Sequence, residues 1–171
     1  SQRPGSRTKT KQSATKRRQT IMRKALFALF ISGCAIFASC DNKVYDIYNH
    51  TPISGWEKND TLSFKIPKMA ENGRYGIDLG LRINEAYPFM GLTLIVEQRI
   101  FPSRVLKTDT LNCELIDNSG NTKGPGVSYY QYNFHVCDMD LNKKDSIYIT
   151  VRHDMKREIL PGISDVGIII E

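Results

Sequence analysis

The first 40 residues of this chain contain no Asp or Glu, although the whole chain has 18 of them. The same segment holds nine of the 24 Lys and Arg residues, so it carries the excess behind the formal charge of +6. After Cys40, 15 basic residues face 18 acidic ones, a net charge of about −3. A basic isoelectric point indicates nucleic-acid binding only when the basic residues belong to the folded domain. We therefore expect no nucleic-acid partner.

No long hydrophobic run follows Cys40, and the run that precedes it is short. Arg23 and Lys24 open this run, about fifteen apolar or small residues follow, and Ala38-Ser39 end it. At 1.5 Å per residue it would span roughly 22 Å, less than the ~30 Å hydrocarbon core of a bilayer. An uncleaved transmembrane anchor is therefore the weaker interpretation. A charged start, an apolar middle and a small-residue end are typical of a cleaved secretory signal.

The cysteine that follows the small pair gives this signal the form of a lipobox, Phe37-Ala38-Ser39-Cys40. We predict that the Cys40 thiol is lipidated and that the lipid tethers the mature protein to a membrane. Three acyl chains at ~0.8 kcal/mol per buried CH₂ would make that attachment almost irreversible. The expected organisation is a disordered basic extension upstream of the true start (1–21), a lipoprotein signal peptide (22–39), a lipidated tether with a first strand (40–54) and a β-sandwich domain (55–171).

Catalytic motifs are missing as well. The three histidines form no His-Glu-x-x-His pair, and the chain has no Gly-x-Ser-x-Gly elbow. In the segment 120–124 the lysine precedes the glycine, which is the wrong order for a phosphate-binding P-loop. We predict that the protein is not an enzyme and needs no cofactor.

One segment, His135 to Asp140, alternates residue types that bind metals. In a strand, His135 and Cys137 would share a face. A zinc site needs three or four ligands, however, and no second pair of ligands is visible. The segment also begins like a calcium loop, but Lys143 stands where that loop requires glycine. We predict no metal site.

Two cysteines remain once Cys34 in the apolar run and Cys40 are set aside: Cys113 and Cys137. An even pair in an oxidising compartment makes a disulfide plausible. Closing a loop of this length would stabilise the fold by about 3 kcal/mol on the chain-entropy model. Two buried free thiols are the alternative, and both interpretations stay open.

The dominant pattern after Cys40 is the alternation of apolar and polar residues, which indicates half-buried antiparallel strands. Turn-forming residues separate seven or eight such runs, at intervals typical of a β-sandwich. We predict an all-β, jelly-roll-like antiparallel β-sandwich of seven to eight strands. The more continuously apolar run 91–101 suits a central strand, and the best helical candidate is the short segment 153–159. Alternation is clearest in the runs 62–66, 75–83 and 147–151.

Aromatic residues offer the main candidates for a binding surface. Trp56 is the single tryptophan, and Tyr129, Tyr130 and Tyr132 lie close together in sequence. By strand alternation Tyr130 and Tyr132 would point together, away from Tyr129. Exposed aromatic rings of this kind stack on sugars or anchor a protein partner. The alternative is that Trp56 and the tyrosines belong to the core. A glycan is therefore a candidate ligand, with Trp56, Tyr130 and Tyr132 as candidate binding residues.

Short motifs along the mature chain, taken in order, resemble the gliding-motility lipoprotein GldH family of Bacteroidetes. No single motif is specific, but their order and the lipobox together carry the resemblance. The matching residues are Cys40-Asp41 with Tyr45 soon after, Gly55-Trp56, Asn84-x-x-Tyr87-Pro88-Phe89, Asp109-Thr110-Leu111-x-Cys113 and Leu160-Pro161-Gly162-Ile163-x-Asp165-Val166-Gly167.

The resemblance implies a membrane-anchored accessory of the gliding machinery and the type IX secretion system. Its implied partners are other envelope proteins of that apparatus, and it implies no catalytic residue. Cys40 is the one functional residue that it transfers. We expect attachment to the outer membrane. The inner membrane is the alternative, because Asp41 directly follows the predicted lipidation site.

One further pattern, Asp-Thr or Asp-Ser before an aliphatic residue, looks like the O-glycan acceptor of Bacteroidetes envelope proteins. The alternative is that Asp followed by a β-branched residue simply opens a strand. The pattern makes three residues candidate O-glycosylation sites: Thr61, Thr110 and Ser146.

Overall fold

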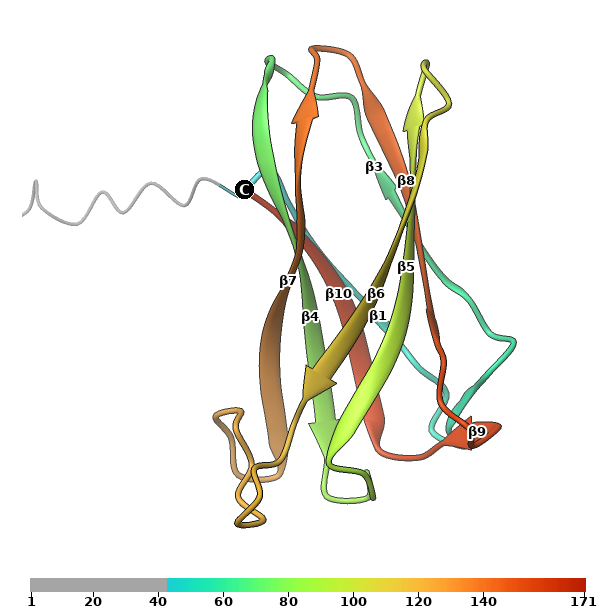
Figure 1. The fold of residues 1–171 in the computed structure, drawn as a ribbon, viewed down its shortest axis with the longest axis vertical. Helices are drawn as coiled ribbons and strands as arrows, with labels where there is room; N and C mark the ends of the chain where they lie inside the picture. Colours follow the sequence, from blue (N-terminus) through green and yellow to red (C-terminus); the bar gives the residue numbers. More distant parts are fainter. Residues whose placement is uncertain (1–42) are drawn as a thin grey trace, which may run out of the picture. The chain divides into compact units, whose positions relative to one another are not determined.

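The computed structural model describes residues 43–171, which form one compact unit built from antiparallel strands (Figure 1). Cys40 and the signal segment lie outside the described residues. The strands are β1 (Tyr45–His50), β2 (Trp56–Glu57), β3 (Leu62–Ile66), β4 (Gly73–Asn84), β5 (Gly91–Phe101), β6 (Leu106–Glu114), β7 (Tyr129–Leu141), β8 (Ser146–His153), β9 (Ile159–Leu160) and β10 (Ile163–Ile170).

Two four-stranded sheets hold the eight longer strands of the described residues. Sheet A has the order β1-β10-β4-β7 and sheet C the order β3-β8-β5-β6, while β2 and β9 form a separate short pair. The chain crosses between the sheets after most strands, which is the connectivity of a two-sheet jelly roll. The predicted all-β, jelly-roll-like sandwich is therefore confirmed. Seven to eight strands were expected, and the described residues form eight long strands and the two-residue strands β2 and β9. The expected first strand after the tether is β1, which pairs with β10.

Alternation along the strands explains how the two sheets bury a common core. In β8, the residues Ile147, Ile149, Val151 and His153 are buried, and the residues between them are half-buried. The run 91–101 is β5, which pairs with both β6 and β8 and is central to sheet C, as predicted. The buried apolar side chains of both sheets form one continuous core.

The predicted helix at 153–159 is wrong. His153 ends β8, a loop follows, and Ile159 opens β9, which pairs with β2 through Trp56↔Leu160. A helix of about seven residues has too few internal hydrogen bonds to offset its nucleation. The pairing of β9 with β2 and the burial of Leu160 therefore determine this segment's conformation, although its local sequence pattern weakly favours a helix.

The β9–β10 turn packs closely against the β4–β5 loop. Gly162 has φ +81°, and a Cβ built on it would lie 2.2 Å from the backbone nitrogen of Tyr87. The Asn84 N–H donates to the carbonyl of Gly162 at 2.8 Å, and the Tyr87 N–H donates to the carbonyl of Asn84 at 3.1 Å. Only a residue without a side chain fits this approach.

On the outer face of sheet A, the ring of Tyr48 lies over two glycines. A Cβ on Gly80 would approach the Tyr48 hydroxyl to 2.1 Å, and one on Gly167 would approach its ring to 2.6 Å. The Arg82 guanidinium lies 4.3 Å from the centroid of the same ring. Because these two residues have no side chain, the Tyr48 ring has room to lie against the sheet.

Trp56 and His153 form a buried pair beside β9. Both are fully buried, and their rings meet edge to face with centroids 5.3 Å apart. His153 Nε2 lies 3.2 Å from the Trp56 carbonyl oxygen, and the Met155 N–H points at His153 Nδ1 at 3.4 Å. One ring nitrogen therefore donates and the other accepts, which is the hydrogen-bonding pattern of a neutral imidazole.

Acidification is expected to destabilise the fold through His153. Burial lowers the pKa of this imidazole from its ordinary value of 6.5. Below pH 6.5 the unfolded chain therefore binds a proton that the folded chain does not, so the contribution is complete above pH 6.5 and declines as the pH falls toward the folded pKa. Urea unfolding of wild type and His153→Gln across this range would show a smaller pH dependence in the variant. NMR titration that finds the folded His153 pKa at or above 6.5 would contradict this.

Candidate functional site

Sheet A has two edge strands, β1 and the longer β7, which pairs on one side with β4. The loop between β6 and β7 covers the first part of this edge, because the Gln131 N–H donates to the carbonyl of Pro125 at 3.1 Å. Unpaired backbone along a sheet edge is a common docking site for an extended peptide. The edge of β7 beyond this loop is therefore the first candidate interaction surface.

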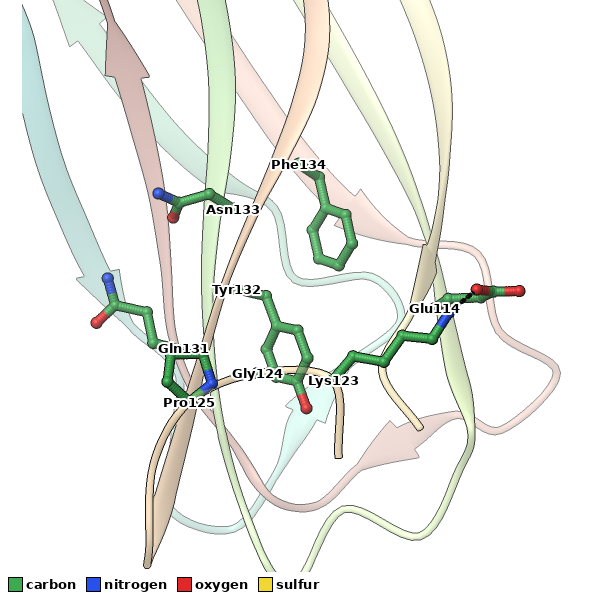
Figure 2. A pocket seen from close by; sticks show the side chains of 8 residues that line it. All are labelled: Glu114, Lys123, Gly124, Pro125, Gln131, Tyr132, Asn133 and Phe134. Carbon is green, nitrogen blue, oxygen red and sulfur yellow. Dashed lines mark hydrogen bonds and ion pairs between the residues drawn. The ribbon is translucent and has the colours of Figure 1, made fainter. Parts of the chain in front are cut away.

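A shallow hollow of about 390 Å³ lies beside β7 (Figure 2). The rings of Tyr132 and Phe134 stack inside it, with centroids 6.0 Å apart and planes 6° from parallel. The Tyr132 hydroxyl donates to the carbonyl of Leu115 at 3.0 Å, which holds its ring in place. An ion pair between Lys123 and Glu114 lies on the opposite side. Aromatic rings beside a strand edge suit reversible binding of a peptide or a sugar.

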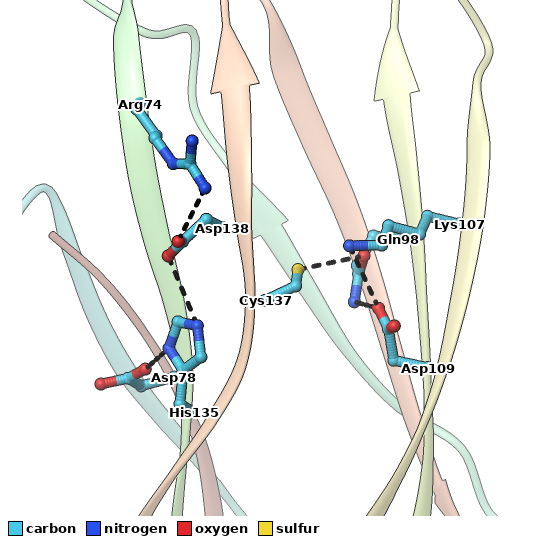
Figure 3. Close-up of polar contacts among 8 residues, drawn as sticks. All are labelled: Arg74, Asp78, Gln98, Lys107, Asp109, His135, Cys137 and Asp138. Atoms are coloured by element: carbon cyan, nitrogen blue, oxygen red, sulfur yellow. Dashed lines mark hydrogen bonds and ion pairs between the residues drawn. The ribbon is translucent and has the colours of Figure 1, made fainter.

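A polar cluster covers the outer face of β4 and β7 (Figure 3). His135 Nδ1 lies 2.8 Å from the Asp78 carboxylate, and His135 Nε2 lies 3.4 Å from that of Asp138. Asp138 also pairs with Arg74 at 3.1 Å. In the described part of the chain, no group of three or more His, Cys, Asp or Glu residues is arranged to hold a metal ion.

The expectation that His135 and Cys137 share a face is wrong. A register shift in the β4–β7 pairing places Cys137 opposite Ile77 and His135 opposite Asp78, with one extra residue between them. This β-bulge reverses the alternation, so His135 points outward and Cys137 points into the sandwich. There the Cys137 thiol lies 3.7 Å from Gln98 Oε1 (Figure 3).

Of the two interpretations left open for the cysteines, the structure has the free thiols and not the disulfide, because Cys113 and Cys137 are both unbridged and buried. Cys137 contacts Gln98, and Gln98 pairs with Lys107 of β6. Cys113 lies on the same strand β6, six residues after Lys107. Six residues of strand cover about 20 Å, far beyond the reach of a disulfide. Burial raises the pKa of the Cys113 thiol to about 12, and burial also raises the pKa of Cys137. Neither thiol is therefore an activated nucleophile.

The hypothesis of an exposed aromatic platform led by Trp56 is wrong as well. Trp56 is fully buried, Tyr132 is buried and Tyr130 is half-buried, whereas Tyr129 is 58% exposed. The tyrosines alternate as expected, but the face shared by Tyr130 and Tyr132 is turned toward the core. The core interpretation of Trp56 is confirmed.

The candidate O-glycosylation sites stay predictions. Thr61 and Thr110 are exposed, and Ser146 is half-buried at the start of β8. Each therefore has at least part of its surface open to solvent. Cys40, the predicted lipidation site, lies outside the described residues. Within residues 43–171, no helix is long and apolar enough to cross a membrane.

Sequence reasoning missed the hollow beside β7 and the polar cluster around His135. The tyrosine-rich segment was one available signal for the hollow, although it pointed to exposed rather than half-covered rings. The ion pairs around His135 depend on the pairing of β4 with β7 and on the bulge, and no local motif encodes either of them.

Comparison with known proteins gives a family match over almost the whole described region. The family model described as GldH lipoprotein matches residues 43–170. The gliding motility lipoprotein GldH of Flavobacterium johnsoniae is 32% identical over 151 residues, covering 84% of this chain and 93% of the relative. A GldH homolog of Christiangramia forsetii is 26% identical over 153 residues, with the same two coverages.

Likeness to solved structures is weaker. A family GH115 4-O-methyl-α-glucuronidase shares 10% sequence identity with a TM-score of 0.41, covering 75% of this chain and 17% of that protein. Similarity at this level carries no argument about function.

Proposed function

Because this chain belongs to the GldH lipoprotein family, we propose that it is a membrane-anchored lipoprotein that acts as a non-catalytic accessory of the gliding motility and type IX secretion machinery. The single observation that carries the proposal is the family match over residues 43–170, which begins three residues after the lipobox cysteine. Lipidation of Cys40 would place the whole sandwich at a membrane surface, and the outer membrane is the membrane we propose.

The structure supports a binding role in two ways. Both described cysteines are buried with raised thiol pKa values, so neither offers a reactive nucleophile. The long edge of β7 and the hollow beside it present unpaired backbone and the half-buried ring of Phe134 to a partner. Confining such a domain to a membrane raises its effective concentration for neighbouring envelope proteins. We therefore propose that it binds other proteins of the envelope apparatus and holds them together.

Cys40→Ala is expected to abolish recovery of gliding and secretion components in a crosslinked pull-down of the tagged full chain from native membranes. The substitution removes the thiol that would receive the lipid, so the protein leaves the membrane fraction. Cys34→Ala is the matched control, because it changes a cysteine of the same apolar run without touching the lipobox. Wild type and Cys34→Ala should recover the same envelope proteins. Equal recovery with Cys40→Ala would contradict the proposal.

A second candidate function is an envelope glycan-binding module. The observation that favours it is the half-buried ring of Phe134, which stacks on the buried Tyr132 in the hollow beside β7 (Figure 2). The same pull-down separates the two candidates. Retention of glycan without any envelope protein would favour the glycan-binding module over the accessory.

A further inference from the structure

Three loops meet at one end of the sandwich, the upper end in Figure 1. They are the β3–β4 loop (67–72), the β5–β6 loop (102–105) and the β7–β8 loop (142–145). A hollow of about 440 Å³ lies among them. Its lining residues are Lys68, Phe101, Pro102, Arg104, Lys144 and Ser146. Half of this lining is cationic, and none of it is acidic.

In the described part of the chain, the three cations of this hollow have no carboxylate partner. Among residues 43–171, no ion pair includes Lys68, Arg104 or Lys144. The neighbouring carboxylate of Asp145 accepts instead from the backbone N–H and side-chain amide of Asn142, at 2.9 and 3.4 Å. The positive charge of the hollow is therefore open to an external anion.

The backbone holds these cations in place. The Met69 N–H donates to the carbonyl of Asp145 at 2.8 Å, and the Lys144 N–H donates to the carbonyl of Met69 at 2.9 Å. Arg104 and Lys144 have φ values of +59° and +76°, and they are the non-glycine residues of the described chain with positive φ. This conformation is unfavourable for a residue with a Cβ, and such outliers gather at functional sites. Both of them lie in this one hollow.

Exposed apolar side chains adjoin the cations. Phe101 is 38% exposed, Val105 53% and Leu106 54%, and all three flank Arg104 in the β5–β6 hairpin. Basic residues beside exposed aromatic and aliphatic ones are typical of protein surfaces that rest in the headgroup region of a membrane.

The described chain enters the sandwich in the half nearer to this end. Tyr45, the first residue of β1, pairs with Ile170, which pairs with Ile77 near the start of β4. The N-terminal end of β1 thus lies toward the β3–β4 loop. Tyr45 is the fifth residue after Cys40, and five residue steps of fully extended chain reach at most about 17 Å. A lipid on Cys40 would keep this end of the sandwich close to the bilayer.

We propose that this surface, named the basic end and made of Lys68, Phe101, Arg104, Val105, Leu106 and Lys144, docks on a membrane by binding the phosphate groups of anionic lipids. The hollow receives a headgroup phosphate between the three cations, while the exposed apolar side chains enter the interface. The inference rests on the proposed function in one respect, since Cys40 sets which end faces the membrane. Docking then orients the β7 edge relative to the bilayer.

The test uses the unlipidated chain from residue 42 onward, which forms one compact unit with its own core. Its partition is measured by sedimentation with vesicles of phosphatidylcholine alone and with phosphatidylglycerol added. We expect binding only to the anionic vesicles. Each basic residue near such a surface contributes about fivefold in affinity, so Arg104→Gln/Lys144→Gln should weaken binding by ~25-fold. Equal binding of wild type to both kinds of vesicle would overturn the proposal.

The matched control is Lys156→Gln/Arg157→Gln. It removes one Lys and one Arg, both exposed, from the β8–β9 loop at the opposite end of the sandwich. Vesicle binding of this variant should stay within about twofold of wild type, because these charges lie beyond a Debye length of ~8 Å from the docked face. Equal losses in the two double variants would mean non-specific attraction and would overturn the proposal. Urea unfolding checks that both variants are folded.

Inorganic phosphate distinguishes the source of the anion. If phosphate in solution shifts the NMR signals of Lys68, Arg104 and Lys144 while anionic vesicles do not bind, the hollow takes a soluble anion and membrane docking is wrong. Binding to the anionic vesicles, with only small NMR shifts on addition of phosphate, supports docking. The assay needs neither the Cys40 lipid nor a protein partner, so its failure leaves the pull-down of the proposed function as a separate test.

Discussion

Gly162→Ala is expected to lower the free energy of unfolding by about 4 kcal/mol, through two effects that act together. The left-handed φ of +81° is unfavourable by roughly 1–2 kcal/mol for a residue with a Cβ. The added methyl group would also lie 2.2 Å from the Tyr87 backbone nitrogen, so the β4–β5 loop must move. That movement strains the hydrogen bond from the Asn84 N–H to the Gly162 carbonyl. Urea unfolding measures the loss.

Gly120→Ala separates the two effects. Gly120 has nearly the same φ, +84°, but a Cβ built on it would meet no atom within 4 Å. Its substitution should therefore lower the free energy of unfolding by only about 1 kcal/mol, the backbone part of the penalty. Equal losses in the two variants would mean that the contact with Tyr87 has no energetic weight.

Trp56→Ala is the second large expected effect, a loss of about 3–5 kcal/mol in the free energy of unfolding. The side chain is fully buried, and its indole N–H donates to the carbonyl of Asp60 at 3.0 Å. Truncation would leave a cavity beside His153 and remove the edge-to-face ring contact. Thermal and urea unfolding of the unlipidated domain measure the change.

Trp56→Phe is the informative comparison. Phenylalanine keeps an aromatic ring in the core but cannot donate to Asp60, so we expect a smaller loss of about 2 kcal/mol. If Trp56 instead served as a surface binding residue, Trp56→Ala would leave the free energy of unfolding unchanged and would weaken only ligand binding. That outcome would contradict the buried position of the indole.

The strands that alternation predicted are those whose inward residues form the core. In β4 and β8 the apolar positions follow a strict period of two, and burial follows the same period except at Gly80, which the Tyr48 ring covers. The segment 153–159 failed as a helix because its outcome depends on pairing between β2 and β9, which are far apart in sequence. Local pattern carries no information about such a partner.

Little of the candidate surfaces could be predicted. The bulge in β7 turned Cys137 inward and left His135 outside, which reversed a reading based on simple alternation. Lys68, Arg104 and Lys144 lie in three separate loops, and only the jelly-roll connectivity brings those loops to one end. Lipidation at Cys40 stays a prediction, because that residue lies outside the described part of the chain.

The seat of Tyr48 over two glycines has a mechanical consequence. If Cys40 carries a lipid, a load transmitted through it would enter the sandwich at β1, the first strand of the described chain. If a partner holds the opposite end, the force runs along β1, and the hydrogen bonds from Tyr45↔Ile170 to His50↔Asp165 share it in shear. Slippage would also have to lift the Tyr48 ring out of the space above Gly80 and Gly167. The packing of the Tyr48 ring on the two glycines would therefore resist sliding of β1 under tension.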